Sequence, residues 1–569
     1  MKKLYIITLL SSLVAFSNNA NSQNFRWAKQ MGGTDYDHGN SIAVDDSGNV
    51  YTTGTFRGTG DFDPGSGTSN LTSAGYSDAF VSKVDSSGNF IWAKQMGGTD
   101  NDYGSPIAID TTNATGGIYL GGTFSGIADF DPGTGTYNLT SAGYSDAFVV
   151  KLSTSGNFIW AKQMGGTSGA YYVSGGSIVL DASGNVYTTG QFGGTVDFDP
   201  GAGIYNLTAV NANIFVSKMD ASGNFIWAKQ MGGTSSSNSS SIKVDINGNV
   251  YTTGSFIGTS DFDPGSGIYN LTSAGIWDIF VSKLDSSGNF LWAKLLGGSA
   301  EDESHSATVD MNGNVYTTGR FKGIADFDPG SGTYNLTPAG IWDIFVSKLD
   351  SSGNFVWAKK MGGSDYDYGN SIAVDLSGNV YITGGFIGTS DFDPGSGTFN
   401  LTSISGSWDI FVSKLNSSGN FILAKQMGGT LDEEGYGIAV DASENIYLTG
   451  YFSGTCDFDP GTGTFNLTSV GGSDDIFVMK LSDVLNGITE NSNLLNEINI
   501  YPNPSTGQIK ITSSRYLDKL KITNQRGQII YQAKHIENNF ALQLATSGIY
   551  FIQITTDKQT ITKKIIVCK

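Results

Sequence analysis

The sequence predicts an all-β fold class: a seven-bladed β-propeller closed by the N-terminal strand, followed by a small Ig-like antiparallel β-sandwich. Three observations predict it. A segment of some 65 residues recurs seven times. Each copy contains four short runs rich in β-branched and aromatic residues, separated by turn signals. The chain also starts and stops in the middle of a copy, so the two ends together make one whole repeat.

The repeat is marked by the segment WAKQMGG, which begins at Trp27 and returns, with variation, in every later copy. Within one period the sequence reads SIAVD, SGN, VYTTGTF, an acidic insert, AFVSKVD, SSGN and FIWAKQ. In each SGN turn the preceding Asp caps the backbone, Gly supplies a positive φ and Asn tolerates one. The pattern therefore predicts four antiparallel strands per repeat, with an extended solenoid or a string of small sandwiches as the alternative. The later copies begin at Trp92, Trp160, Trp227, Trp292, Trp357 and Leu423.

The two half-repeats favour a ring. The first copy begins at FRWAKQ, and the last copy stops at IFVMKL (residues 476–481), where another turn and strand should follow. We therefore expect FRWAKQ to pair antiparallel with the last strand and complete its sheet. A solenoid would instead need polar caps at both ends.

The segment SIAVDDSGNVYTTG (residues 41–54) resembles the SBBP and NHL classes of β-propeller repeat, over roughly residues 24–481. The resemblance implies that SIAVD lines the channel and that FIWAKQ is the outer edge strand, but it implies almost no chemistry. Lysines recur in the SK and WAK segments, as at Lys83 and Lys94. We interpret them as charges on outer strands that discourage edge-to-edge pairing.

The chain divides into four segments. Residues 1–22 predict a secretory signal peptide, because Lys2 and Lys3 precede an apolar run too short to span a membrane. Residues 23–481 form the predicted propeller, residues 482–497 a polar linker and residues 498–569 the small sandwich. Cys456 and Cys568 stand in separate regions, so no disulfide framework is expected in this exported protein.

The tail contains the segments YPNPSTG, GQIIY, SGIYFIQI and KKIIVCK in that order. It resembles the C-terminal sorting domain of the type IX secretion system of Bacteroidetes. The resemblance implies recognition by that machinery, outer-membrane translocation, removal of the tail, and attachment to the cell surface or release. An ordinary Ig-like adhesion module is the alternative. The implied sorting signal comprises Tyr501, Pro502, Asn503, Pro504, Gly507, Gly527, Gly548, Lys563 and Lys564.

Composition excludes several functions. The formal charge is −20 in total, but residues 498–569 carry +7 and the signal segment +2, which leaves −29 on residues 23–497, the predicted propeller together with its linker. Such an acidic body repels nucleic acid and anionic lipid. The propeller contains two histidines, His38 and His305, in non-equivalent contexts, and its three arginines lie in different repeats, so no nucleophilic, zinc or sialidase-like site is predicted.

A functional site should appear as a departure from the repeat, because such sites lack symmetry. The departures cluster in the loop after MGG, which reads TDYDHGN in the first copy and SAEDESH in the fifth. By the propeller analogy these loops share one face with the acidic inserts. That face predicts a binding scaffold with variable tips.

The acidic insert reads DFDPG. Its two aspartates point to one side of an extended segment and Phe to the other, which leaves two interpretations open. The carboxylates cap the Pro-Gly turn, or they join backbone carbonyls to bind Ca²⁺ as a cofactor. The residues concerned are Asp61, Asp63, Asp129, Asp131, Asp197, Asp199, Asp261, Asp263, Asp326, Asp328, Asp391, Asp393, Asp457 and Asp459.

The sequence thus predicts a secreted or surface-displayed binding or adhesion module with a glycan or protein ligand. One alternative is a carbohydrate-active or peptide-processing enzyme that uses loop carboxylates, although no catalytic residue is predicted. The other is a structural surface-layer component.

Overall fold

The computed structural model describes residues 22–110, 116–166, 173–484 and most of 498–567, except 502–504, 506, 514–516, 525–528, 537–538, 547 and 556–559. The chain separates into two compact units, one spanning Ala20–Val484 and the other containing Leu485–Lys569. The predicted signal peptide up to residue 21 and linker residues 485–497 lie outside the described residues.

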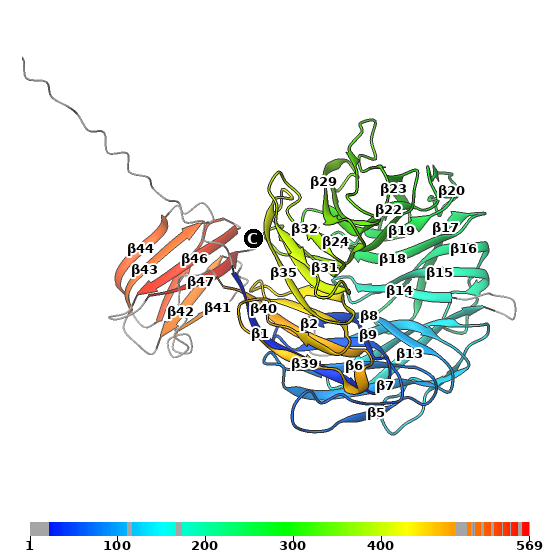
Figure 1. Cartoon of the computed structure of the whole chain (residues 1–569), viewed down its shortest axis with the longest axis horizontal. Coiled ribbons are helices and arrows are strands. Elements are labelled where there is room, and N and C mark those ends of the chain that lie inside the picture. Colours follow the sequence, from blue (N-terminus) through cyan, green and yellow to red (C-terminus); the bar gives the residue numbers. More distant parts are fainter. Residues whose placement is uncertain are drawn as a thin grey trace, which may run out of the picture. The chain divides into compact units, whose positions relative to one another are not determined.

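In the first unit each repeat forms a group of four antiparallel strands, called a sheet here, and added hairpins extend these groups into continuous sheets of six or ten strands (Figure 1). Sheet 1 has the order β2 (His38–Val44), β3 (Val50–Phe56), β6 (Asp78–Val84), β7 (Phe90–Gly98). Sheet 2 contains β8 (Asp102–Asp110), β9 (Gly117–Phe124), β12 (Asp146–Ser153) and β13 (Phe158–Gly166), and sheet 3 contains β14 (Val173–Leu180), β15 (Val186–Asp197), β16 (Asn206–Met219) and β17 (Phe225–Gly233). Sheet 4 contains β18 (Ser237–Val244), β19 (Val250–Phe256), β22 (Asp278–Leu284) and β23 (Phe290–Gly298), and sheet 5 contains β24 (Asp302–Val309), β25 (Val315–Phe321), β28 (Asp343–Leu349) and β29 (Phe355–Gly363). Sheet 6 contains β30 (Asp367–Val374), β31 (Val380–Phe386), β34 (Asp409–Leu415) and β35 (Phe421–Gly429), and sheet 7 contains β36 (Glu433–Val440), β37 (Ile446–Phe452), β40 (Asp475–Val484) and β1 (Ser22–Gly33).

The predicted turn chemistry is confirmed in the hairpin between β2 and β3. The backbone N–H groups of Ser47 and Asn49 donate to Asp45 Oδ1 at 3.0 and 2.8 Å, and the Asn49 amide donates to Asp45 Oδ2 at 2.7 Å. Gly48 has φ +78°, a conformation that glycine adopts without a Cβ penalty. This turn recurs through the repeats and sets the register of the first two strands.

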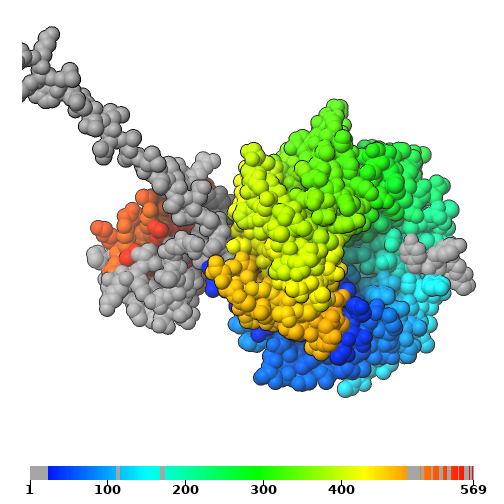
Figure 2. Space-filling model, viewed as in Figure 1, coloured from blue at the N-terminus to red at the C-terminus, as the bar shows by residue number. Residues whose placement is uncertain are grey.

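The two ends of the repeat array meet in sheet 7. β1 pairs antiparallel with β40 from Ser22↔Val484 to Met31↔Ile476, so the expected pairing of FRWAKQ with the last strand is confirmed. The first strands of neighbouring sheets also contact one another along the series β2, β8, β14, β18, β24, β30 and β36, and β36 contacts β2. In Figure 2 the orange surface of the last repeat borders the blue surface of the first.

The acidic insert forms an additional hairpin that the sequence did not predict. β4 (Thr59–Asp61) and β5 (Asn70–Thr72) follow β3 of sheet 1, but β4 pairs with β1 of sheet 7 through Gly32↔Asp61 and Gly33↔Gly60. Each insert therefore connects its own sheet to the preceding sheet, because its first strand pairs with the last strand of that sheet. The corresponding hairpins are β10 (Ile127–Asp129) with β11 (Asn138–Thr140), β20 (Thr259–Asp261) with β21 (Asn270–Thr272), β26 (Ala325–Asp326) with β27 (Asn335–Leu336), β32 (Thr389–Asp391) with β33 (Asn400–Thr402), β38 (Thr455–Asp457) with β39 (Asn466–Thr468), and the outer halves of β15 and β16 in sheet 3.

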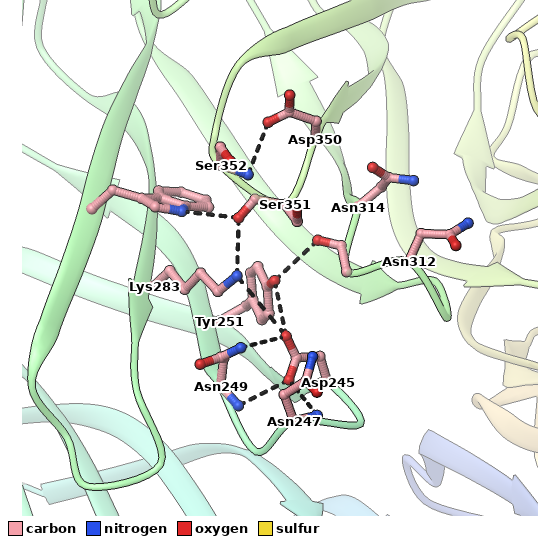
Figure 3. A network of polar contacts seen from close by, with 12 residues as sticks. Asp245, Asn247, Asn249, Tyr251, Lys283, Asn312, Asn314, Asp350, Ser351 and Ser352 are labelled. Carbon is pink, nitrogen blue, oxygen red and sulfur yellow. Dashed lines mark hydrogen bonds and ion pairs between the residues drawn. The ribbon is translucent and has the colours of Figure 1, made fainter.

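The interpretation of the SK lysines as outer-strand charges is wrong. Lys283 lies on β22, the third strand of its sheet, with Nζ 4.7 Å from the ring centre of Tyr251. It donates to the Ser351 carbonyl of the next sheet at 2.9 Å, and Trp292 Nε1 donates to the same oxygen at 3.2 Å (Figure 3). These lysines join neighbouring sheets, because a buried ammonium needs an acceptor and finds it in the next sheet, while the tyrosine ring adds a cation–π contact. Lys83, Lys151, Lys218, Lys348 and Lys480 make the equivalent contact to a turn carbonyl.

The second unit contains two antiparallel sheets that share one apolar core, as a sandwich does. Tyr501 lies half-exposed at the end of one strand, Gly507 has φ +110°, Gly548 begins a strand, and Lys563 and Lys564 lie on the last strand. Pro502, Asn503, Pro504 and Gly527 lie outside the described residues. One sheet contains β41 (Ile498–Tyr501), β42 (Gln508–Ser513) and β45 (Asn539–Gln543), and the other contains β44 (Ile529–Ile536), β43 (Leu517–Asn524), β46 (Gly548–Thr555) and β47 (Thr560–Val567).

Candidate functional site

The aspartates of the DFDPG inserts hold their own hairpins together. Asp61 Oδ1 accepts the backbone N–H groups of Asp63 and Ser69 at 3.0 and 2.8 Å, and Asp63 Oδ1 accepts that of Gly65 at 2.8 Å. The same bonds recur in the other copies, for example at Asp261 and Asp263. Phe62 points to the other side, where it is fully buried with its ring 4.9 Å from that of Phe80. The carboxylates thus act as turn caps.

Calcium binding by these inserts stays a prediction. In the part of the chain that the structure describes, no group of three or more His, Cys, Asp or Glu side chains is arranged to hold a metal ion.

A second set of carboxylates is fully buried where one sheet meets the next. A Cβ atom on Gly297 would lie 2.7 Å from Asp278 Oδ1 and 3.0 Å from Asp302 Oδ2, so both side chains face this glycine. Burial raises the pKa of Asp278 to about 6 and that of Asp302 to about 7. At two junctions a neutral residue replaces one or both carboxylates. The paired carboxylates are Asp475 with Asp37, Asp78 with Asp102, Asp278 with Asp302, Asp343 with Asp367, and Asp409 with Glu433, whereas Asp146 meets Val173 and Asn213 meets Ser237.

These carboxylates predict that the first unit is more stable at pH 5 than at pH 8. Their pKa values lie above the ordinary 3.8, so between about pH 4 and pH 7 the folded chain keeps protons that the unfolded chain has released. The free energy of unfolding then falls as pH rises through this window, by about 1.4 kcal/mol per group and pKa unit. The measurement is the melting temperature at both pH values.

The matched variant combines Asp278→Asn with Asp302→Ser, which copies the natural Asn213 and Ser237 junction. It should show a smaller loss of melting temperature from pH 5 to pH 8 than the parent. The exposed Asp46→Asn serves as the charge control. An unchanged loss in the double variant would contradict this account of the junctions.

Residues that differ between copies of the repeat lie close together at the start of the first strands in sheets 5, 6, 7 and 1. The post-MGG loops do lie beside the inserts, since the Arg57 N–H donates to Asp37 Oδ1 at 3.0 Å and the Ile387 N–H to the Tyr366 carbonyl at 3.0 Å. Around this end of the sheets, side chains of four repeats form one connected network, which we call the mouth cluster. It consists of Glu303, His305, Arg320, Trp342, Tyr368, Asn370, Trp408, Glu434, Tyr436, Tyr451, His38 and Asp474.

In sheet 5 the cluster encloses a cation. The Arg320 guanidinium lies 4.5 Å from the ring centre of Trp342 and 4.6 Å from that of Tyr368. Its Nε and Nη2 atoms donate to Glu303 Oε2 at 2.9 and 2.7 Å. His305 lies 3.7 Å from the same carboxylate, and these contacts lower the pKa of Glu303. Two aromatic faces and one carboxylate therefore hold the guanidinium.

In sheet 6 a tryptophan, a tyrosine and a glutamate also meet, and the position equivalent to Arg320 is a glycine, Gly385. The rings of Tyr368 and Trp408 lie 4.8 Å apart, and a Cβ atom on Gly385 would lie 2.9 Å from both Trp408 Cε3 and Glu434 Cγ. The Glu434 carboxylate accepts from the Asn370 amide at 3.2 Å and from the Tyr451 hydroxyl at 3.4 Å. Burial raises the pKa of Glu434.

In sheet 7 the cluster reaches the ends of the repeat array. The His38 ring stacks on Tyr451 at 4.6 Å, and His38 Nε2 lies 2.9 Å from Asp474 Oδ2. Tyr436 packs against Tyr451 at 5.5 Å. Because His38 comes from the first repeat and Asp474 from the last, this part of the cluster forms only when the two ends meet.

Sequence reasoning located this face but missed the cluster. It treated Arg320, His38 and His305 as isolated, because they lie in different repeats. An available signal was the residue that directly precedes the buried phenylalanine of each second strand. It is Thr55, Thr123, Gln191 and Ser255 in sheets 1 to 4, and Arg320, Gly385 and Tyr451 in sheets 5 to 7.

Comparison with known families identifies segments of both units. Residues 26–55, 226–260 and 356–384 match the model described as beta-propeller repeat, and residues 499–568 match the secretion system C-terminal sorting domain. The chain carries β-propeller repeats and a type IX sorting domain. This sorting domain implies interaction with the type IX machinery and points to secretion, at the cell surface or outside the cell. In the described part of the chain, no helix has the length and apolar character needed to cross a bilayer.

Individual relatives add little about function. An uncharacterized WD repeat-containing protein, L264, of Acanthamoeba polyphaga mimivirus is 24% identical over an alignment of 511 residues that covers 75% of this chain and 36% of that protein. A solved protein of unknown function from Bacteroides caccae has a TM-score of 0.29 at 9% identity, covering 61% of this chain and 89% of that one. PorZ, a surface component of the type IX system of Porphyromonas gingivalis, has a TM-score of 0.17 at 10% identity, covering 95% and 100%. Structural matches with TM-scores this low do not support any statement about the function of this chain.

Proposed function

We propose that this exported protein is a surface binding or adhesion module, and that its first unit is a closed seven-bladed β-propeller with the mouth cluster as its ligand-binding site. Closure is supported by the pairing of β1 with β40 and by the contact of β36 with β2. The observation that carries the binding role is the convergence of the departures from the repeat in one connected network. Tyr251 and Lys283, which contact neighbouring strands and sheets, have equivalents in every copy, whereas the cluster residues do not.

The chemistry of the cluster suits recognition. Aromatic rings, carboxylates and a guanidinium lie together at partly exposed positions such as His38, Tyr368, Trp408 and Glu434. Aromatic faces supply contact area to a ligand, and carboxylates supply directed hydrogen bonds. Ligand-binding sites commonly combine the two, since the polar groups fix the orientation of the ligand and give specificity.

The test is binding of the mature full chain to a glycan array and a peptide array, beside the double variant Tyr368→Ala, Trp408→Ala. We expect signals with the parent that fall at least about tenfold in the variant, while signals of Asp46→Asn stay at the parent level. Melting temperatures of all three proteins show whether the variant is folded. If the parent binds neither array, or if the variant binds as the parent does, the cluster is not a binding site and a structural surface-layer role is favoured.

One observation favours a second function, a carbohydrate-active enzyme. Glu303 and Glu434 face the same cluster, and their pKa values are shifted in opposite directions, Glu303 by its contacts with His305 and Arg320 and Glu434 by burial. Such a division between two carboxylates is typical of acid–base pairs. Incubation of the parent with each bound glycan, followed by analysis for shortened products, distinguishes an enzyme from a binding module.

A further inference from the structure

We propose that the asparagine of each recurring Asn-Leu-Thr segment is an N-glycosylation site, which carries a sugar on its side-chain amide nitrogen. Asn-x-Ser/Thr, with any residue but proline at x, is the acceptor sequence for this modification in exported proteins. Such a segment occurs in every copy of the repeat, and the modification is independent of ligand binding at the mouth cluster. The segments begin at Asn70, Asn138, Asn206, Asn270, Asn335, Asn400 and Asn466.

Each segment lies on the second strand of its acidic insert. In the first copy Asn70, Leu71 and Thr72 form β5, the edge strand of its sheet. Asn70 and Thr72 are exposed, whereas Leu71 is half-buried. The same alternation recurs in the other six copies. Each asparagine therefore faces solvent, where a modifying enzyme can reach its side chain.

The other two residues of the segment have contacts that explain why they recur. Leu71 packs against the apolar core beneath the hairpin. Thr72 Oγ1 lies 2.8 Å from Thr59 Oγ1 across the hairpin. Among the described residues, by contrast, the side chains of the seven recurring asparagines make no hydrogen bond or ion pair. Contacts in the fold therefore do not explain why the asparagine is constant.

Neighbouring exposed positions do vary between copies. The residue two places before the asparagine is threonine or isoleucine, as at Thr68 and Ile204. The residue directly before it is serine, tyrosine or phenylalanine, as at Ser69 and Phe399. Because these positions have changed while the asparagine has not, duplication of the repeat alone does not account for it. A process that recognises Asn-x-Thr does.

Three other asparagines fit the acceptor pattern, each in one copy. Asn113 lies outside the described residues. Asn238 Oδ1 accepts the Ser255 backbone N–H at 3.1 Å, and Asn416 Oδ1 accepts two backbone N–H groups of its own turn. The fold explains Asn238 and Asn416, so they are not among the proposed sites.

The transfer uses a sugar that is activated as a diphosphate ester at its anomeric carbon. The asparagine amide nitrogen forms a bond to that carbon and loses a proton. The bond between the carbon and the diphosphate oxygen breaks, and the diphosphate leaves with the electron pair. The attached sugar would also shield an uncharged edge strand from pairing with other chains.

The experiment is peptide mass spectrometry of the mature full chain, purified after expression in a Bacteroidetes host that secretes through the type IX system. We expect sugar on the asparagines of the Asn-Leu-Thr peptides and none on the exposed Asn247, which is followed by Gly-Asn. Thr272→Val should abolish the modification of Asn270, because it removes the acceptor sequence, whereas Thr272→Ser should retain it. The six unchanged segments in each variant show that the chain was exported and modified.

Unmodified asparagines at all seven sites would overturn the inference, and so would sugar found instead on serine or threonine hydroxyl groups. Equal modification of Asn270 in the Thr272→Val and Thr272→Ser chains would also contradict it, because the acceptor sequence would then not be what the enzyme recognises. The first two results come from the parent chain, so they do not depend on the folding of any variant.

Discussion

Deleting residues 24–30 is expected to leave the first unit poorly soluble and to lower its melting temperature by about 10 °C or more. The deletion removes most of β1, including the buried Trp27 and Ala28, and leaves the edge of β40 without a partner. Loss of such core side chains costs several kcal/mol each, and an unpaired edge invites aggregation. The measurements are soluble yield and thermal unfolding of the deleted and parent chains.

A permuted chain supplies the control for this deletion. Residues 22–33 are moved behind Val484 and joined to it by an Asn-Gly turn, which the Ser22↔Val484 pairing allows. This chain restores the strand in its place and should melt close to the parent. A deletion that left yield and melting temperature at the parent values would show that the fold does not depend on β1.

Truncation after Val484 is expected to abolish surface display and to leave folded protein in the periplasm. The sorting domain match covers residues 499–568, and β40 ends at Val484, so the truncation removes the sorting domain without cutting a strand of the first unit. Protease accessibility and cell fractionation measure the outcome. A chimera of residues 485–569 behind an unrelated exported domain controls for sufficiency and should reach the surface. Normal surface levels of the truncated chain would contradict a sorting role for the tail.

The strands and turns were predictable from the sequence because their causes are local and recur in every copy. The Asp45 turn needs only Asp, Gly and Asn at fixed spacing, and the β-branched and aromatic residues of VYTTGTF favour a strand. The strand pairing made by the acidic insert was not predictable in the same way, because Asp61 pairs with Gly32 of a different repeat. The lysine interpretation failed for the same reason, since the acceptor of Lys283 lies in the next sheet.

The candidate site was predictable only in outline. The sequence indicated the face that carries the departures, but it did not show that Arg320, Tyr368 and Trp408 from two repeats form one group. That grouping depends on how neighbouring sheets pack, which sets Tyr368 of sheet 6 beside Arg320 of sheet 5. The calcium hypothesis was based on the aspartates of the acidic inserts. Their carboxylates accept hydrogen bonds from backbone N–H groups within the hairpin.

Hydrogen–deuterium exchange of the mature chain, with and without the tightest-binding array ligand, tests most directly whether the mouth cluster is the functional site. The account predicts slower exchange of backbone amides at the starts of β24, β30, β36 and β2, where the cluster residues lie, and unchanged exchange at the tips of the hairpins. Protection confined to the hairpins or to the C-terminal unit, with no change at these four strands, would contradict it.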